Sequence, residues 1–83
     1  MAIEKNWSML NSDICEVGEE LGFEWNAIVD EIQNHGFYAE DADGSFTVYK
    51  KDIPDIKSDI LRRIFMHIFN AYNIPKSIIV INV

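Results

Sequence analysis

Cys15, His35 and His67 are the only thiol and imidazole side chains in this chain of 83 residues. None of them stands at a spacing typical of metal ligands. A Cys–His nucleophile pair stays open as an alternative, because folding can bring distant residues together. Cys15 follows the apolar Ile14, however, and a small buried thiol is common in such a place. The chain also lacks a nucleophilic-serine motif, a phosphate-binding glycine loop and a paired-carboxylate motif, so we expect neither an enzyme nor a cofactor or metal site.

Residues 41–44, with the sequence Asp-Ala-Asp-Gly, look like the middle of a calcium-binding EF-hand loop. In that alignment the first ligand position falls on Ala39 and the last on Lys50. Calcium needs a carboxylate at the first position and a bidentate glutamate at the last. We therefore interpret the segment as a plain hairpin turn, in which Gly44 is able to adopt a positive φ.

Charge is distributed very unevenly along the chain. Eleven of the fourteen acidic residues lie in the first 44 positions, where Lys5 is the only basic residue, so this segment carries a charge of −10. Residues 45–83 carry +3, and the whole chain carries −7. A field of one sign steers association and repels like-charged molecules, including nucleic acids and anionic membranes. We therefore expect a protein partner with a basic surface, and no direct contact with nucleic acid or membrane.

The acidic residues of the first half allow three interpretations. In the simplest, they form a solvated face that keeps a small protein soluble. In the second, they imitate a row of phosphates and occupy the nucleic-acid-binding groove of another protein, as a phage-type inhibitor would. Residues four apart on a helix are about 6 Å apart, which is comparable with the phosphate spacing along a strand. In the third, they bind some other basic partner.

The residues expected to bind the partner are five carboxylates and one aromatic side chain: Glu16, Glu19, Glu20, Asp30, Glu31 and Trp7. Phe23 and Trp25 are further candidates for an aromatic anchor, because a few aromatic residues often dominate the energy of an interface. Trp25 begins an apolar helical repeat, so its expected place is the core. Trp7 is freer because it precedes the first predicted helix.

The second half of the chain holds a basic group of five residues: Lys50, Lys51, Lys57, Arg62 and Arg63. These residues are expected to balance the acidic half as ordinary surface charges. The alternative function is a small nucleic-acid- or ligand-binding module that uses the basic third helix. No aromatic residues alternate with these charges, and the overall negative field works against the alternative.

Hydrophobic periodicity predicts three helices. The first runs from Ser8 or Ser12 to Leu21, the second from about Glu24 to Asn34, and the third from Ser58 to Asn73. The third carries a wide apolar stripe at positions 60, 61, 64, 65, 68, 69 and 72. Four residues of this stripe are the expected centre of the core: Leu61, Ile64, Phe65 and Ile68.

Residues 37–50 are predicted to form a β-hairpin, and residues 77–83 a strand that is apolar on both faces. The order of elements is ααββαβ, in a two-layer α+β domain whose small three-stranded mixed sheet is packed by the third helix. A return through that helix predicts that the last strand is parallel to the second hairpin strand and lies at an edge. Because apolar edges invite pairing, we expect a homodimer through residues 77–83, a covering partner, or a cover from the N-terminal segment.

Length and composition predict one cytoplasmic domain spanning residues 1–83. The single cysteine excludes an internal disulfide and fits a reducing compartment. No segment has the roughly 20 apolar residues that a membrane span needs. The N-terminus lacks the features of a signal peptide.

Overall fold

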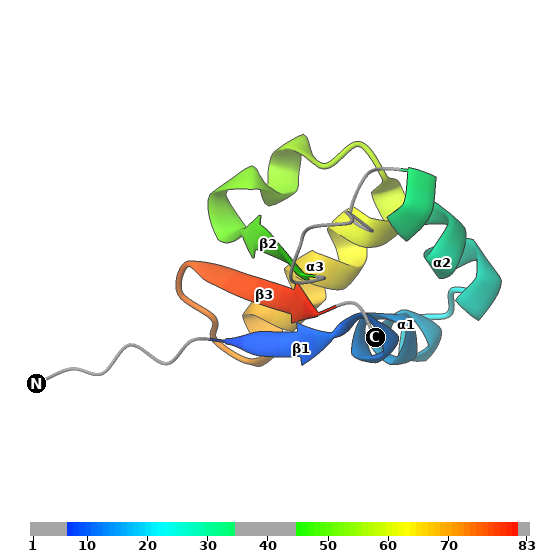
Figure 1. Cartoon of the computed structure of the whole chain (residues 1–83), viewed down its shortest axis with the longest axis horizontal. Coiled ribbons are helices and arrows are strands. Elements are labelled where there is room, and N and C mark those ends of the chain that lie inside the picture. The colour runs from blue at the N-terminus through cyan, green and yellow to red at the C-terminus, as the bar shows by residue number, and fades with distance from the viewer. Residues whose placement is uncertain (1–6, 35–44, 82–83) are drawn as a thin grey trace, which may run out of the picture.

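The computed structural model describes residues 7–34 and 45–81. Its elements are β1 (Ser8–Leu10), α1 (Asn11–Glu20), α2 (Trp25–Asn34), β2 (Ser45–Tyr49), the 3-10 helix η1 (Lys50–Asp55), α3 (Asp59–Ala71) and β3 (Ser77–Ile81). Figure 1 shows α3 running behind the strands, with α1 and α2 beside one end of the sheet. The predicted α+β class, with a small three-stranded mixed sheet packed by the third helix, is confirmed.

The sheet has the order β1-β3-β2, so the last strand is its centre. β3 pairs in parallel with β1, where Ile79 lies opposite Ser8, and antiparallel with β2, where Ile79 lies opposite Thr47. The sequence-based expectation of an edge strand parallel to the second hairpin strand is therefore wrong on both points. The predicted homodimer through residues 77–83 depended on an exposed strand edge, and β3 has no such edge because β1 and β2 pair with both of its sides.

Two features of the chain explain this difference. The segment Ser8–Leu10, assigned from sequence to the region where the first helix begins, forms a strand and occupies one side of β3. η1 and the residues after it carry the chain back along the molecule before α3 begins, as Figure 1 shows. α3 then reverses the direction of the chain a second time, so β3 enters the sheet antiparallel to β2. The first strand of the predicted hairpin and its turn at 41–44 lie outside the described residues.

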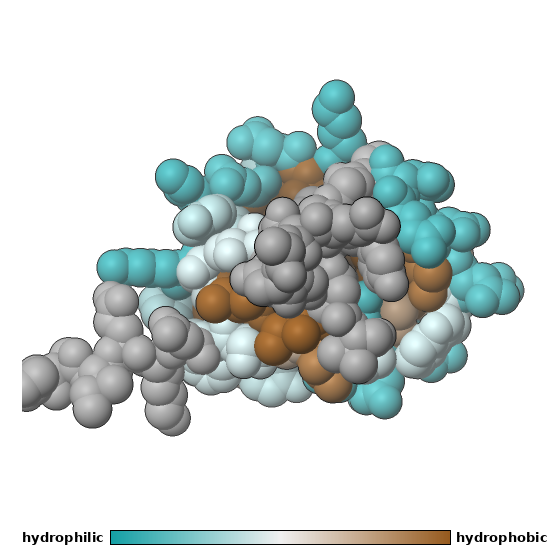
Figure 2. Space-filling view, viewed as in Figure 1, coloured by the Kyte–Doolittle hydropathy of each residue, from teal (hydrophilic) through white to brown (hydrophobic). Residues whose placement is uncertain are grey.

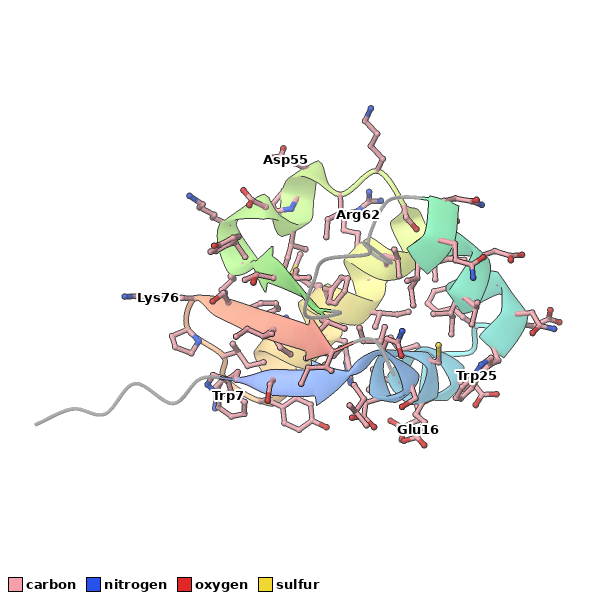
Figure 3. The ribbon with its side chains drawn as sticks, in the orientation of Figure 1. Trp7, Glu16, Trp25, Asp55, Arg62 and Lys76 are labelled. Atoms are coloured by element: carbon pink, nitrogen blue, oxygen red, sulfur yellow. The ribbon has the colours of Figure 1, made fainter. Side chains whose placement is uncertain are left out.

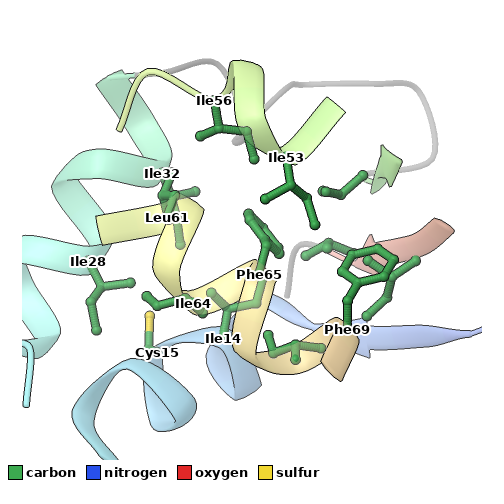
Figure 4. Packing of buried hydrophobic residues seen from close by; sticks show 14 of the residues in the cluster. Ile14, Cys15, Ile28, Ile32, Ile53, Ile56, Leu61, Ile64, Phe65 and Phe69 are labelled. Carbon is green, nitrogen blue, oxygen red and sulfur yellow. The ribbon is translucent and has the colours of Figure 1, made fainter. Parts of the chain in front are cut away.

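The core is built around α3. Five of its side chains are buried: Leu61, Ile64, Phe65, Ile68 and Phe69. The first four of these are the residues predicted as the centre of the core. All five belong to one cluster with Ile14 and Cys15 of α1, Ile28 and Ile32 of α2, and Ile53 of η1, and Figure 4 labels all of these residues except Ile68. Tyr72, the last position of the predicted stripe, departs from the pattern because it follows the end of α3 and is 53% exposed.

β3 uses its two faces differently. Ile78 and Val80 are buried, whereas Ile79 and Ile81 on the opposite face are partly exposed. Figure 2 shows apolar side chains at the surface over the strands, with hydrophilic side chains around the periphery. No helix within the described residues is long and apolar enough to cross a membrane.

Local signals fix the ends of the helices. The Ser58 hydroxyl accepts a hydrogen bond of 3.2 Å from the Leu61 amide, which caps the start of α3. Gly22, with φ +98°, follows α1 in the left-handed conformation that glycine favours at a helix end. Both ends agree with the sequence-based expectations.

Gly18 allows α1 to lie close to the other two helices. A Cβ atom placed there would lie 2.9 Å from Cδ1 of Ile64, and nearer still to Cδ1 of Ile28. Glycine inside a helix costs about 1 kcal/mol relative to alanine. The close approach explains why α1 carries this residue despite the cost.

Candidate functional site: an acidic groove beside the first helix

One face of α1 combines three carboxylates with an apolar side chain. This face is formed by four residues at intervals of three, one and three positions, which places them on the same side of the helix: Asp13, Glu16, Val17 and Glu20. The Asp13 carboxylate accepts a hydrogen bond of 3.2 Å from the Leu10 amide, at the end of the helix where a negative charge is favoured. Glu16 and Glu20 are exposed in the C-terminal half.

This face borders a groove of about 300 Å³. The other walls come from the residues around β1, from the C-terminal end of α3, and from the chain that enters β3. The most deeply buried lining residues are three isoleucines, which we call the floor: Ile68, Ile74 and Ile78. Trp7, Met9 and Val17 are partly buried walls, and Tyr72 is an exposed aromatic side chain of the lining.

The groove lies in a strongly negative part of the molecule. Residues 7–34 contain seven acidic and no basic residues. Within the described part of the chain, Glu16 and Glu20 form no salt bridge. Glu20 is also in the last turn of α1, where the helix dipole disfavours a carboxylate, and it repels Glu16 as a like charge four residues away. Their placement therefore costs stability that no cation in the described residues offsets.

The structure brings together three of the six residues predicted to bind a partner. Trp7, Glu16 and Glu20 line the groove, and Figure 3 shows Trp7 and Glu16 along the same side of the molecule. Glu19 is exposed on α1 and does not line the groove. Asp30 and Glu31 belong to α2, where the first is exposed and the second is half-buried.

The aromatic side chains differ from their sequence-based expectations. Trp25 was expected in the core but is 39% exposed, because it is the first residue of α2 and precedes the buried positions of that helix. Trp7 was expected to be freer, yet it is partly buried against the core. Its backbone carbonyl accepts a hydrogen bond of 2.9 Å from the Ile79 amide, which ties the residue to β3.

Among the lining residues that sequence reasoning did not assign to a binding site are Asp13 and Tyr72. The signal for Asp13 was present, because it shares a helical face with Glu16 and Glu20. No local signal identified Tyr72, which continues the apolar repeat of α3 but lies beyond the helix end.

The basic residues of α3 are partly engaged in holding their own helix. Asp59 forms ion pairs with both Arg62 and Arg63, the latter at 3.1 Å. Arg62 also donates a hydrogen bond of 2.9 Å to the carbonyl of Ile56. Figure 3 places Arg62 on the opposite side of the molecule from Trp7 and Glu16, with Lys76 at one end.

Cys15 has the environment of a core residue. Its side chain is only 3% exposed, and burial raises the pKa of the thiol, with the negative charge of Glu19 adding to the effect. A raised pKa disfavours the thiolate, which is the reactive form. His67 is exposed on α3, and His35 lies outside the described residues. Residues 7–34 and 45–81 contain no group of three or more His, Cys, Asp or Glu side chains that could hold a metal ion.

Comparisons of the chain with protein-family models, with curated proteins and with solved structures found no match.

Proposed function

We propose that this chain is a small acidic binding protein that inhibits or regulates a protein partner with a basic surface. The observation that carries the proposal is the groove itself. Three carboxylates border an apolar floor, inside a segment of seven acidic and no basic residues. A surface that only kept the protein in solution would need the charges but not the groove beside them.

The two parts of this surface contribute differently to binding. The negative field of α1 and α2 accelerates the encounter with a basic surface and orients it, an effect that weakens as salt is added. The apolar and aromatic lining then contributes to the lifetime of the complex, because burial of such side chains provides most of the affinity at interfaces. Electrostatic complementarity thus governs the association rate more than the final affinity.

The concrete version of the proposal is a phage-type inhibitor that blocks a nucleic-acid-handling enzyme by imitating the charge of its substrate. Such an enzyme presents a basic groove. Glu16 and Glu20 are exposed helical neighbours about 6 Å apart, close to the spacing of phosphates along a strand.

The alternative, a nucleic-acid- or ligand-binding module using α3, has less support. Asp59 pairs with both arginines of that helix and reduces the charge available to phosphates. A gel-shift assay with DNA and RNA separates the two functions, since retention of either nucleic acid by the unmodified chain would favour α3.

Capture of partners from the source cells, followed by mass spectrometry, provides the protein on which the proposal is tested. Reversal of Glu16, Glu19 and Glu20 to lysine is then compared with the unmodified chain in association kinetics over a range of salt concentrations. We expect association at low salt to slow by roughly tenfold or more, and its salt dependence to flatten.

The control reverses Asp52 and Asp55, two exposed carboxylates of η1 on the basic half of the chain, and so changes two charges where the triple reversal changes three. This control should have a much smaller effect on the rate. Circular dichroism checks that each variant is folded. An association rate at low salt that the triple reversal leaves unchanged would show that the acidic face is not the binding surface.

A further inference from the structure

The size of the groove limits what it can hold. Small-molecule sites usually have volumes of about 300–1,000 Å³, so a groove of about 300 Å³ is at the lower limit. That space suits one or two side chains of a partner better than a drug-sized ligand. The occupant should therefore be a short projection from a protein surface.

The lining requires a side chain that is apolar along its length and cationic at its end. Trp7, Met9 and Val17 are partly buried and give the groove its accessible apolar walls, whereas Glu16 and Glu20 are exposed at the rim. Long basic side chains have this division, with an aliphatic stem and a charged head. A shorter polar side chain would leave the partly buried apolar walls in water, and an apolar one would leave the carboxylates without a cation.

The end of α3 adds to the preference for a cation. Tyr72 follows this helix directly, and the last turn of α3 contains no basic residue. The C-terminus of a helix has a partial negative charge, which favours a nearby cation. Two aromatic rings, those of Trp7 and Tyr72, also line the groove, and aromatic faces attract cations.

We propose that this groove receives an arginine side chain from the protein partner. The inference rests on the proposed function and names the group that the acidic surface recognises. Arginine is favoured over lysine because its planar guanidinium pairs with two carboxylate oxygens at once, stacks on aromatic rings and is less strongly hydrated. Glu16 and Glu20 would hold the guanidinium, and the partly buried side chains of Trp7, Met9 and Val17 would cover the stem.

The test uses the full chain labelled with 15N and three acetylated and amidated tripeptides as probes: Gly-Arg-Gly, Gly-Lys-Gly and Gly-citrulline-Gly. Citrulline has nearly the shape of arginine without its charge. We expect the arginine peptide to shift the Trp7 indole and the Val17 and Tyr72 amide resonances saturably, with a dissociation constant on the order of 10 mM. The lysine peptide should bind several-fold more weakly, and the citrulline peptide should cause no saturable shift.

Two double variants test whether the effect depends on the groove or only on the total charge. Glu16→Gln/Glu20→Gln should weaken arginine binding about tenfold, as expected for the loss of two partly exposed ion pairs. Glu24→Gln/Asp52→Asn removes the same charge from exposed positions that do not line the groove, and it should change binding by less than about twofold. All four changed residues are exposed, so both variants should fold, which amide spectra would verify.

Several results would overturn the arginine site. These are equal binding of the citrulline peptide, equal losses in the two double variants, or shifts that never saturate. Shifts of the groove resonances on dilution of the chain alone would assign the groove to a second copy and would likewise overturn it.

Failure of this proposal is distinguishable from failure of the proposed function. If the arginine site fails while the triple reversal still slows the partner, the acidic face remains the binding surface. If the arginine peptide binds but the reversal leaves the partner's association rate unchanged, the proposed function is wrong and the site stands.

Discussion

The three carboxylates on the groove face of α1 have different relations to the fold. Asp13 accepts a hydrogen bond from the Leu10 amide and so helps to start the helix. Glu16 and Glu20 form no salt bridge among the described residues, and Glu20 is in the last turn of α1, where the helix dipole disfavours a negative charge. Within the described residues, Asp13 therefore contributes to the fold, whereas Glu16 and Glu20 have no stabilising ion pair.

Cys15 provides a prediction about pH. Burial raises the pKa of its thiol in the folded chain above the ordinary value of 9.0, and the charge of Glu19 adds to this. Above that pH the unfolded chain releases the proton while the folded chain keeps it. The free energy of unfolding should therefore fall as pH rises above about 9, by at most about 1.4 kcal/mol per pH unit.

Urea unfolding of the unmodified chain and of Cys15→Ala between pH 7 and pH 10.5 measures this contribution. The alanine variant is less stable at every pH because it leaves a cavity, so the comparison concerns only the slopes. We expect the part of the decrease in the free energy of unfolding above pH 9.0 that the thiol causes to be absent in Cys15→Ala. Parallel slopes in the two proteins would show that the thiol ionises equally in both states.

At the scale of elements, hydrophobic periodicity predicted α1, α2 and α3 because each buries one face against the others. It failed at β1, since Ser8, Met9 and Leu10 are too few to show alternation and directly precede a helix. The error at β1 then placed β3 at an edge. The partners of a strand are set by tertiary contacts that leave no local pattern.

Gly18 provides a prediction about the packing of helices. Gly18→Ala should destabilise the protein by about 1–3 kcal/mol, because the new Cβ collides with Ile28 and Ile64. This loss is expected although alanine is the better helix former by about 1 kcal/mol. The nearest obstacle is Cδ1 of Ile28, the atom that Ile28→Val removes.

A double-mutant cycle isolates that collision. Alone, Ile28→Val should cost about 0.5–1.5 kcal/mol, but in the Gly18→Ala background most of this cost should vanish. The coupling between the two sites should be at least about 0.5 kcal/mol in urea unfolding of the four proteins. Additive effects would mean that α1 and α2 are not in close contact at this point.

At the scale of the whole molecule, the groove combines segments that are distant in sequence. Its α1 face could be predicted, because Asp13, Glu16 and Glu20 are spaced as one side of a helix. Its opposite walls could not be predicted, since Trp7 and Tyr72 come to line the same groove only when β1, α3 and β3 have packed together. The charge of a segment can be counted from the sequence, whereas a groove lined by distant segments can be identified only from the folded structure.

The charge of the molecule leads to a final prediction, in which binding residues reduce stability. With seven acidic and no basic residues in 7–34, the folded chain repels itself. Raising the salt concentration from 0.01 to 0.15 M shortens the screening length from about 30 to about 8 Å, so the free energy of unfolding should rise. Urea is the suitable denaturant because guanidinium chloride is itself a salt.

The same measurement compares the two double variants defined for the arginine site. At low salt, Glu16→Gln/Glu20→Gln should be more stable than the unmodified chain by about 0.3–1 kcal/mol, through relief of the repulsion between residues four apart and of the unfavourable helix dipole. Glu24→Gln/Asp52→Asn should not gain stability, because Glu24 directly precedes α2 and Asp52 lies in the first turn of η1, where a helix favours negative charge. The gain should shrink at 0.15 M salt. If the groove variant is no more stable than the control at low salt, the two glutamates do not strain the fold, and the stability argument for an external cation is lost.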